Sequence, residues 1–425
     1  MTEDPVFALA LGLPPVCAVL LWLQARGKMP GGLDSRLCRD FLIIILALSL
    51  PFAACELYWR LTETLLLCLF LLLPILVCAL TAVFFRFNRN RRTPAGPGRL
   101  LAGNVLVLLC LLSLTLPCGE VYYRFIYDET DWAAYTKVSA RWGKKHYRLN
   151  RAGFRDSMEY APRMEPGKRR ISFLGDSFTV GHGVKDVEKR FANLIRRRHP
   201  GWEIHALARN GNDTGAELEL LDKCATDGYQ LDQVVLVYCL NDISDLPGEW
   251  KRTLADVSAR VRRRPEICDS SYFLDILFHR LVVARAPEVR NYGRQIAAGY
   301  RGVVWEEQRR RLQAVRDRVQ SRGGRLLVVT FPFLDALGPK YPFQFAHDEL
   351  AAWWKELGVP HLDLMPALKE FRPRALTVSA FDAHPNELAH SVAAEKIEGF
   401  LAEQIPPSKS TLDAGKARSS EGKAK

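Results

Sequence analysis

The sequence predicts an α/β domain built on a parallel sheet, preceded by an N-terminal membrane-spanning region. Charged residues make up 25% of the 425 residues, yet the first 118 contain long stretches with almost none. Beyond residue 165, short apolar runs alternate with longer segments whose apolar residues recur every three or four positions. Strands and helices that alternate in this way are typical of a parallel sheet covered by helices on both faces.

The N-terminal region, residues 1–118, contains apolar stretches that are each near the roughly 20 residues a helix needs to cross a bilayer. The stretches are Pro5 to Leu23, Phe41 to Trp59, Leu65 to Phe85 and Leu100 to Cys118. The first contains Pro14 and Pro15, and the second has Glu56 near its end, so three spans are the alternative to four. We predict about four transmembrane helices that anchor the chain, and their composition argues against a transport path.

Basic residues in the loops predict the orientation of these helices, because Lys and Arg near the spans stay on the cytoplasmic side. The first and third loops carry four and five of them, whereas the second carries only Arg60 and the residues before Pro5 carry none. We therefore expect an integral protein of the cell or inner membrane, with both chain ends and the large C-terminal domain outside the cytoplasm.

Five short apolar runs in the C-terminal part predict buried strands, because they are rich in aliphatic residues and bounded by turn residues. The runs are Ile171 to Leu174, Ile204 to Leu207, Val234 to Tyr238, Leu326 to Phe331 and His361 to Leu364. Helical periodicity separates or follows them at Lys189 to Arg198, Ala216 to Thr226, Trp305 to Arg322, Asp348 to Leu357 and Glu387 to Gln404. The predicted domain spans residues 165–405.

Three segments fall outside this alternation. Residues 119–164 are aromatic and polar, and we expect them to pack on the domain as a lead-in. Residues 248–300 form an Arg-rich insertion that indicates either a solvated surface or a cleft for an anionic substrate. Residues 406–425 contain few apolar residues and are predicted to be a disordered tail. No nucleic-acid partner is expected outside the cytoplasm.

Ser177 is the first candidate for chemistry, since the sequence GDSFTVG places it just after the first predicted strand and before a helix. A hydroxyl there stands beside backbone N–H groups, which suits a nucleophile. We expect Asp176 to hydrogen-bond locally and shape the turn. The pattern differs from the G-x-S-x-G turn of the α/β-hydrolases.

His384 is the candidate general base, and it precedes the last predicted helix in the sequence FDAHPN. A serine hydroxyl needs a neighbouring base, and that base needs an orienting carboxylate, which Asp382 can supply. His182 is a rival base because it is close to Ser177 in sequence. His390 lies about one and a half turns into the last helix and is expected to pack or to support the site indirectly.

Two further motifs follow predicted strands. Gly211 lies after the second strand and Asn241 after the third. With the Ser177 N–H, the Gly211 N–H and the Asn241 amide would give an oxyanion hole with three donors. Each motif alone also occurs as an ordinary turn or helix cap, but their joint occurrence at strand ends favours a hydrolytic site.

The cysteines predict no metal centre. Seven of the ten lie in residues 1–118, and the remaining ones, Cys224, Cys239 and Cys268, are too widely spaced for a disulfide framework or a zinc site. We interpret these three as core thiols.

Over residues 165–404, roughly, the sequence resembles the SGNH, or GDSL-type, hydrolase family. The residues that name the family would be Ser177, Gly211, Asn241 and His384. The resemblance implies a flavodoxin-like three-layer α/β/α fold and the site roles given above, with Asp382 as partner of His384 and no cofactor. Two positions depart from the family pattern. Cys239 replaces its usual glycine, and Phe381 stands where the aspartate is usually found, three before the histidine.

The sequence therefore predicts a membrane-anchored, extracytoplasmic serine esterase. Its location favours acyl groups on an envelope glycan or lipid as the substrate. An O-acyltransferase with the same triad, supplied by an acyl-donor protein partner, is the alternative, because a sugar hydroxyl can replace water as acceptor. A non-catalytic binding module is a further alternative, since folds persist when their chemistry is lost.

Overall fold

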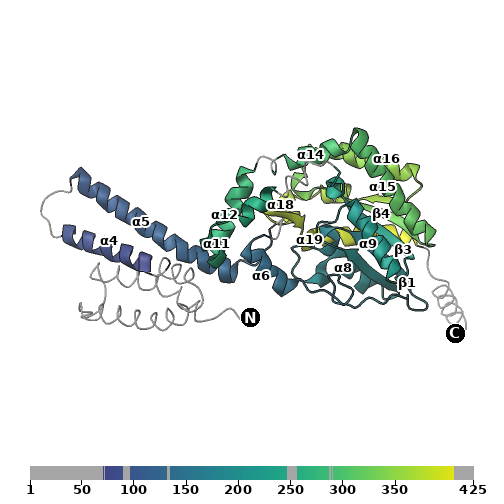
Figure 1. Cartoon of the computed structure of the whole chain (residues 1–425), viewed down its shortest axis with the longest axis horizontal. Coiled ribbons are helices and arrows are strands. Elements are labelled where there is room, and N and C mark those ends of the chain that lie inside the picture. The colour runs from purple at the N-terminus through teal and green to yellow at the C-terminus, as the bar shows by residue number, and fades with distance from the viewer. Residues whose placement is uncertain are drawn as a thin grey trace, which may run out of the picture. The chain divides into compact units, whose positions relative to one another are not determined.

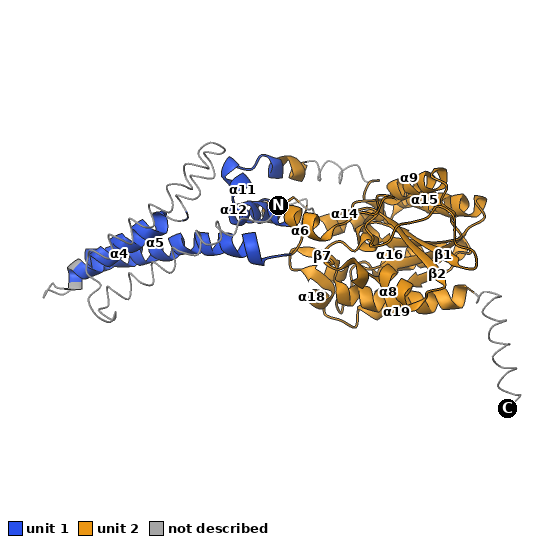
Figure 2. Ribbon diagram, turned by 90° about the horizontal axis from the view of Figure 1, so that it is seen from below, with its two compact units in different colours: residues 1–128, 136–138, 260–282 blue, residues 129–135, 139–259, 283–425 orange. Residues whose placement is uncertain are grey.

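The computed structural model describes residues 70, 72–89, 96–131, 135–246, 256–286, 289 and 291–405. The first two predicted membrane spans and the predicted tail lie outside the described residues. The chain divides into two compact units. Unit 1 comprises residues 1–128, 136–138 and 260–282, and unit 2 comprises residues 129–135, 139–259 and 283–425 (Figure 2).

Unit 2 is built on one parallel sheet of five strands in the order β2-β1-β3-β4-β5. Figure 1 labels β1, β3 and β4 of this sheet. The strands are β1 (Arg169–Gly175), β2 (Trp202–Ala208), β3 (Gln233–Cys239), β4 (Arg325–Phe331) and β5 (His361–Asp363). All five predicted strands are present, and the predicted parallel α/β fold is confirmed.

The sheet separates two apolar cores, because alternate side chains of a strand point to opposite faces. In β3, Val234, Leu236 and Tyr238 belong to one core, whereas Val235 and Val237 belong to the other. Because both faces are covered, β3 consists of consecutive buried apolar residues after Gln233, which is the pattern that predicted it.

Helices on the two faces complete three layers. The core on one face contains residues of α9 (Thr214–Thr226), α15 (Gly302–Ser321) and α16 (Gln344–Glu356). The core on the other face contains residues of α8 (Phe191–Arg198) and α19 (Glu387–Gln404). These are the five predicted helical segments, with ends shifted by up to four residues.

The remaining elements of unit 2 are short. They comprise the helices α7 (Ser177–Val180), α14 (Tyr292–Gly299), α17 (Met365–Leu368) and α18 (Pro373–Leu376), the 3-10 turns η3 (Val187–Lys189), η4 (Leu240–Ile243) and η5 (Leu334–Ala336), and the antiparallel pair β6 (Thr377–Ser379) and β7 (Asp382–Pro385). Helix α6 (Lys137–His146) lies in the lead-in segment. The lead-in also contributes Phe154 and Tyr160 to the core.

Unit 1 contains α4 (Leu73–Arg89), α5 (Pro97–Val121), the π-helical turn η2 (Tyr122–Ile126), α11 (Glu266–Ser270) and α12 (Tyr272–Arg285). The described part of the Arg-rich insertion thus contains helices, and its residues 260–282 belong to this unit. The Glu120 carboxylate accepts the backbone N–H groups of Tyr272 and Phe273, at 3.1 and 3.0 Å. It therefore caps the start of α12.

Among the described residues, one helix is long and apolar enough to cross a membrane. It runs over Pro97–Ile126, and the shorter Leu73–Arg86 is also apolar. These helices coincide with the fourth and third predicted spans. The membrane crossing itself stays a prediction.

Gly175, the last residue of β1, provides a test of the packing at this end of the sheet. A Cβ here would overlap Thr179 Oγ1 and lie 3.0 Å from the Val237 carbonyl oxygen. We expect Gly175→Ala to lower the free energy of unfolding by about 1–3 kcal/mol, through overpacking.

The control is Gly399→Ala in α19, where a Cβ meets no atom within 4 Å. Alanine is the better helix former, so this variant should be more stable by about 0.5–1 kcal/mol. Thermal unfolding of the full chain in detergent measures both. Equal stability of Gly175→Ala and wild type would contradict the packing at this strand end.

Candidate active site

Ser177 lies just after the carboxyl end of β1, the strand between β2 and β3 in the sheet. Asp176 caps the short helix α7 by accepting the Phe178 N–H at 2.8 Å, and Gly181 ends that helix with a φ of 72°. The strand, cap and glycine together hold Ser177 in the first turn. The expected local role of Asp176 is therefore seen in the structure.

His384 and Asp382 approach Ser177 from β7, near the C-terminal end of the domain. His384 Nε2 lies 2.8 Å from Ser177 Oγ, and His384 Nδ1 lies 2.5 Å from Asp382 Oδ1. Residues two apart on a strand share one face, so a spacing of two between Asp382 and His384 suffices. A carboxylate two residues before the histidine is therefore within hydrogen-bond reach of it, although the family pattern has the carboxylate three before.

The electrostatics make His384 a stronger base and keep the carboxylate beside it ionised. Burial by itself lowers the pKa of His384, but the charge and hydrogen bond of Asp382, with the charge of Asp176, outweigh burial and raise it. Burial raises the pKa of Asp382, yet the nearby histidines and hydrogen bonds hold it well below its usual range. The His384 Nδ1–H then donates to Asp382, which leaves the Nε2 lone pair for the Ser177 proton.

The predicted oxyanion-hole residues lie at the ends of three neighbouring strands. Because β1 lies between β2 and β3, Ser177 has Gly211 after one neighbour and Asn241 after the other. Gly211 adopts a φ of 78°, which favours glycine. Asn241 lies in η4, and its Nδ2 donates to Asp176 Oδ2 at 3.4 Å. The order of the strands changes direction between β1 and β3, and ligands bind at such a point in open parallel sheets.

The rings of the other two candidate histidines make no hydrogen bond to the Ser177 hydroxyl; His182 meets Ser177 only through its backbone N–H, which donates to the Ser177 carbonyl at 3.0 Å. His390 is buried, accepts the Phe191 N–H at 3.4 Å and stacks on that ring, which agrees with the expected packing role. His182, the rival base, instead has its Nε2 3.6 Å from Asp382 Oδ2 and 3.3 Å from the Asp131 carbonyl oxygen.

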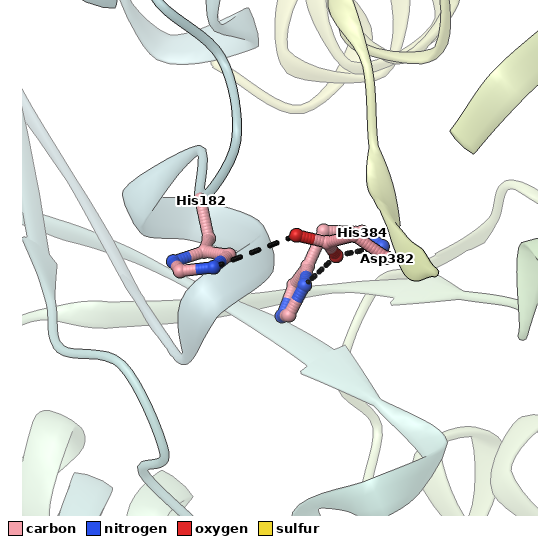
Figure 3. A group of neighbouring side chains, drawn as sticks. All are labelled: His182, Asp382 and His384. Carbon is pink, nitrogen blue, oxygen red and sulfur yellow. Dashed lines mark hydrogen bonds and ion pairs between the residues drawn. The ribbon is translucent and has the colours of Figure 1, made fainter. Parts of the chain in front are cut away.

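The three side chains His182, Asp382 and His384 come close enough to resemble a metal site (Figure 3). Their ligand atoms lie within 4.8 Å of one another. However, each ring nitrogen nearest Asp382 faces only acceptors, so in each ring this nitrogen carries the hydrogen rather than a free lone pair. Hydrogen bonds of His384 to Asp382 and of His182 to the Asp131 carbonyl oxygen therefore account for the arrangement.

The sequence motifs did not identify Thr130, although it contacts the triad. Its hydroxyl donates to Asp382 Oδ2, across 252 positions of sequence. Thr130 belongs to the lead-in segment and follows no motif, so no spacing in the sequence indicated it.

Comparisons with known proteins agree with this geometry. The sequence model of the GDSL-like Lipase/Acylhydrolase family matches residues 173–392, just over half of the chain, and this range contains Ser177, Gly211, Asn241 and His384. No curated protein matches.

Several solved structures are similar. A lipolytic protein of the G-D-S-L family from Veillonella parvula has 13% identity and a TM-score of 0.34, covering 54% of this chain and 95% of its own. An extracellular lipase from Streptomyces rimosus has 18% identity and a TM-score of 0.35, covering 55% and 99%. A phospholipase A1 from Streptomyces albidoflavus has 15% identity and a TM-score of 0.34, covering 54% and 99%.

The raised pKa of His384 predicts the pH dependence of any reaction that uses it as a base. The ring must be neutral to accept the serine proton, so kcat/KM should fall as the pH drops through a value above 6.5, the ordinary pKa. A pH profile with a soluble ester measures this.

The matched variant is Asp382→Asn, which removes the charge that raises the pKa. Its acid limb should lie at lower pH than that of wild type, and its kcat should be about 10⁴-fold lower, as when a triad carboxylate is neutralised elsewhere. An acid limb of the wild type at or below 6.5 would contradict the assigned electrostatics.

Proposed function

This chain belongs to the GDSL-like Lipase/Acylhydrolase family, which implies ester hydrolysis, and we propose that it is a serine esterase with Ser177 as nucleophile. The observation that carries this proposal is the chain of contacts from Ser177 Oγ through His384 to Asp382, at 2.8 and 2.5 Å. A hydroxyl, an imidazole and a carboxylate in this order form the unit that activates serine in hydrolases of unrelated fold.

In the proposed reaction, Ser177 Oγ attacks the ester carbonyl carbon while His384 Nε2 takes the hydroxyl proton. The tetrahedral intermediate collapses, the C–O bond to the leaving alcohol breaks, and His384 returns the proton to that alcohol. Water then attacks the acyl-enzyme with His384 as base, which releases the acid and restores Ser177. Throughout, the Asp382 carboxylate stabilises the imidazolium.

The oxyanion would be held by the N–H groups of Ser177 and Gly211 and by the Asn241 amide. Asn241 Nδ2 has two hydrogens, and its contact with Asp176 uses one. The other remains for the oxyanion, while Asp176 keeps the amide from turning away. Loss of one such donor costs about 3–4 kcal/mol of transition-state stabilisation in a comparable enzyme.

The direct test is turnover of p-nitrophenyl acetate by the full chain in detergent. We expect Ser177→Ala and His384→Ala each to lose about 10³-fold or more in kcat, because the two residues act as a unit. Ser321→Ala and His199→Ala are matched controls outside the triad and should keep wild-type rates. A fluorophosphonate probe should label wild type and fail to label Ser177→Ala.

Unchanged turnover in a folded Ser177→Ala would sink the assignment of the nucleophile. The acceptor is read from the products of the wild type. With a sugar acceptor added, free acid as the main product supports the esterase, whereas an acylated sugar would identify the transferase, which needs an acyl donor. A folded wild type that neither turns over esters nor takes the probe would indicate a binding module.

We further propose that the domain is tethered outside the cytoplasm and acts on acyl groups of an envelope glycan or lipid. The tether is supported by the apolar helix Pro97–Ile126 and by the apolar stretches of residues 1–118. The orientation is supported by the basic first and third loops, which favour the cytoplasmic side.

An epitope tag placed after Lys425 should be reached by antibody on intact cells, because the proposed orientation puts this end outside. A matched tag between Arg91 and Arg92, in the basic third loop, should be reached only after the cells are permeabilised. The protein should also stay in the membrane fraction after an alkaline carbonate wash. The reverse accessibility of the two tags would contradict the orientation.

A further inference from the structure

The two carboxylate oxygens of Asp382 have different partners. Oδ1 accepts the His384 Nδ1–H at 2.5 Å and the His384 backbone N–H at 3.1 Å, and Oδ2 accepts the Thr130 hydroxyl. Oδ2 also faces the His182 ring (Figure 3). We propose that Thr130 and His182 are positioning residues that hold Asp382 in the orientation from which it aligns His384. This inference rests on the proposed esterase function.

Thr130 is fixed in place by close packing. Its side chain is 2% exposed, and Oγ1 lies 3.2 Å from the position that a Cβ on Gly183 would take. Gly183 has a φ of 83°, and a Cβ there would also overlap Val378 of β6. Glycine at 183 therefore leaves the space that lets Thr130 reach Asp382, and the Thr130 hydroxyl aims at a carboxylate that is itself 1% exposed.

His182 contributes a fixed N–H group rather than a charge. Its Nε2 faces two acceptors, the Asp131 carbonyl oxygen and Asp382 Oδ2, while its Nδ1 lies 3.3 Å from Asn210 Nδ2, a donor. This pattern selects the neutral Nε2–H tautomer. Burial, with repulsion from His384, lowers the pKa of His182 to about 4, so the ring stays neutral near pH 7.

The neutral ring of His182 also supports His384 sterically. The two ring centroids lie 4.5 Å apart, and Trp142 lies behind His182 with its centroid at 5.9 Å. Two imidazoles thus face Asp382. Because the His182 ring is neutral, it does not compete with His384 for the negative charge of the carboxylate. A protonated His182 would do so and would weaken the pairing of Asp382 with His384.

Asp382 needs this support because the strand that carries it is short and irregular. β7 has four residues, it pairs only with the three-residue β6, and the register between them is shifted. Within the strand, the His384 backbone N–H holds Oδ1 at 3.1 Å. On the far oxygen, the Thr130 hydroxyl donates to Oδ2 and the His182 ring lies beside it, and together they limit rotation of the carboxylate. A misplaced orienting group lowers the rate through geometry rather than through substrate binding.

Thr130 comes from a part of the sequence outside the family domain. It lies outside the family match at residues 173–392 and only four residues after Ile126, where the apolar helix ends. The segment that follows the predicted anchor thus supplies a support for the catalytic carboxylate, so the site extends beyond the family domain.

The test compares paired variants of the full chain in detergent, with p-nitrophenyl acetate as substrate. Thr130→Val is nearly isosteric but cannot donate, and it should lower kcat about 10- to 100-fold with little change in KM. Thr130→Ser keeps the hydroxyl and should keep most of the rate. Likewise His182→Leu should lower kcat, whereas His182→Gln, which keeps an N–H donor, should restore part of it.

A double-mutant cycle shows whether Thr130 acts through Asp382. In the Asp382→Asn background, adding Thr130→Val should change kcat by less than about twofold, because coupled residues are not additive. A full additional loss there would overturn the proposal, as would a wild-type kcat in folded Thr130→Val. Equal losses in Thr130→Val and Thr130→Ser would also overturn it.

Ser177→Ala, run in parallel, separates this inference from the proposed function. If Ser177→Ala keeps its turnover, the esterase mechanism fails. If Ser177→Ala is inactive while Thr130→Val and His182→Leu are as fast as wild type, only the positioning roles fail. Thermal unfolding identifies a variant that does not fold, and in that case the other pair decides.

Discussion

The site depends on one constraint of a parallel sheet, which is that all strands present their carboxyl ends at the same edge. With β1 between β2 and β3, the residues after these three strands converge, although Ser177 and Asn241 are far apart in sequence. Gly175 permits the close approach at this edge, because any side chain there would meet Thr179 and the Val237 carbonyl. The sheet thus supplies the predicted nucleophile and the predicted oxyanion donors.

The base and its carboxylate come from outside the five-stranded sheet, so another interaction must position them. Asn386, two residues after His384, provides it. Its Nδ2 donates to the carbonyl groups of Ala375 and Thr377, and its Oδ1 accepts the N–H groups of Leu388 and Ala389 at the start of α19. One side chain therefore ties the residue after β7 to the end of α18 and the start of β6, and it caps the helix that packs on the sheet. The His-Pro-Asn sequence thus holds His384 in position through Asn386.

The sequence predicted the parts of the fold that follow from burial and periodicity. The central strand β3 is an unbroken apolar run from Val234 because both faces of the sheet are covered, and this pattern can be recognised without a structure. β6 and β7, at three and four residues, are too short to show a period. The helix α12 was missed because its own apolar residues are spread around most of its circumference, so the sequence shows no clear apolar face. Thr130 was missed because its contact with Asp382 depends on how the lead-in folds back, which no local spacing records.

Buried acidic groups near the site affect how much negative charge surrounds Ser177 and His384. Asp176, Glu217 and Asp242 are all fully buried, and no hydrogen-bond partner of the Glu217 carboxylate is found among the described residues. Burial, reinforced for Glu217 and Asp242 by repulsion from their acidic neighbours, raises the pKa values of all three. Like charges so placed do not all ionise together, and protons shared among them reduce the negative field. An oxyanion can then form beside Asp176, and an ionised Asp382 remains the charge that governs His384.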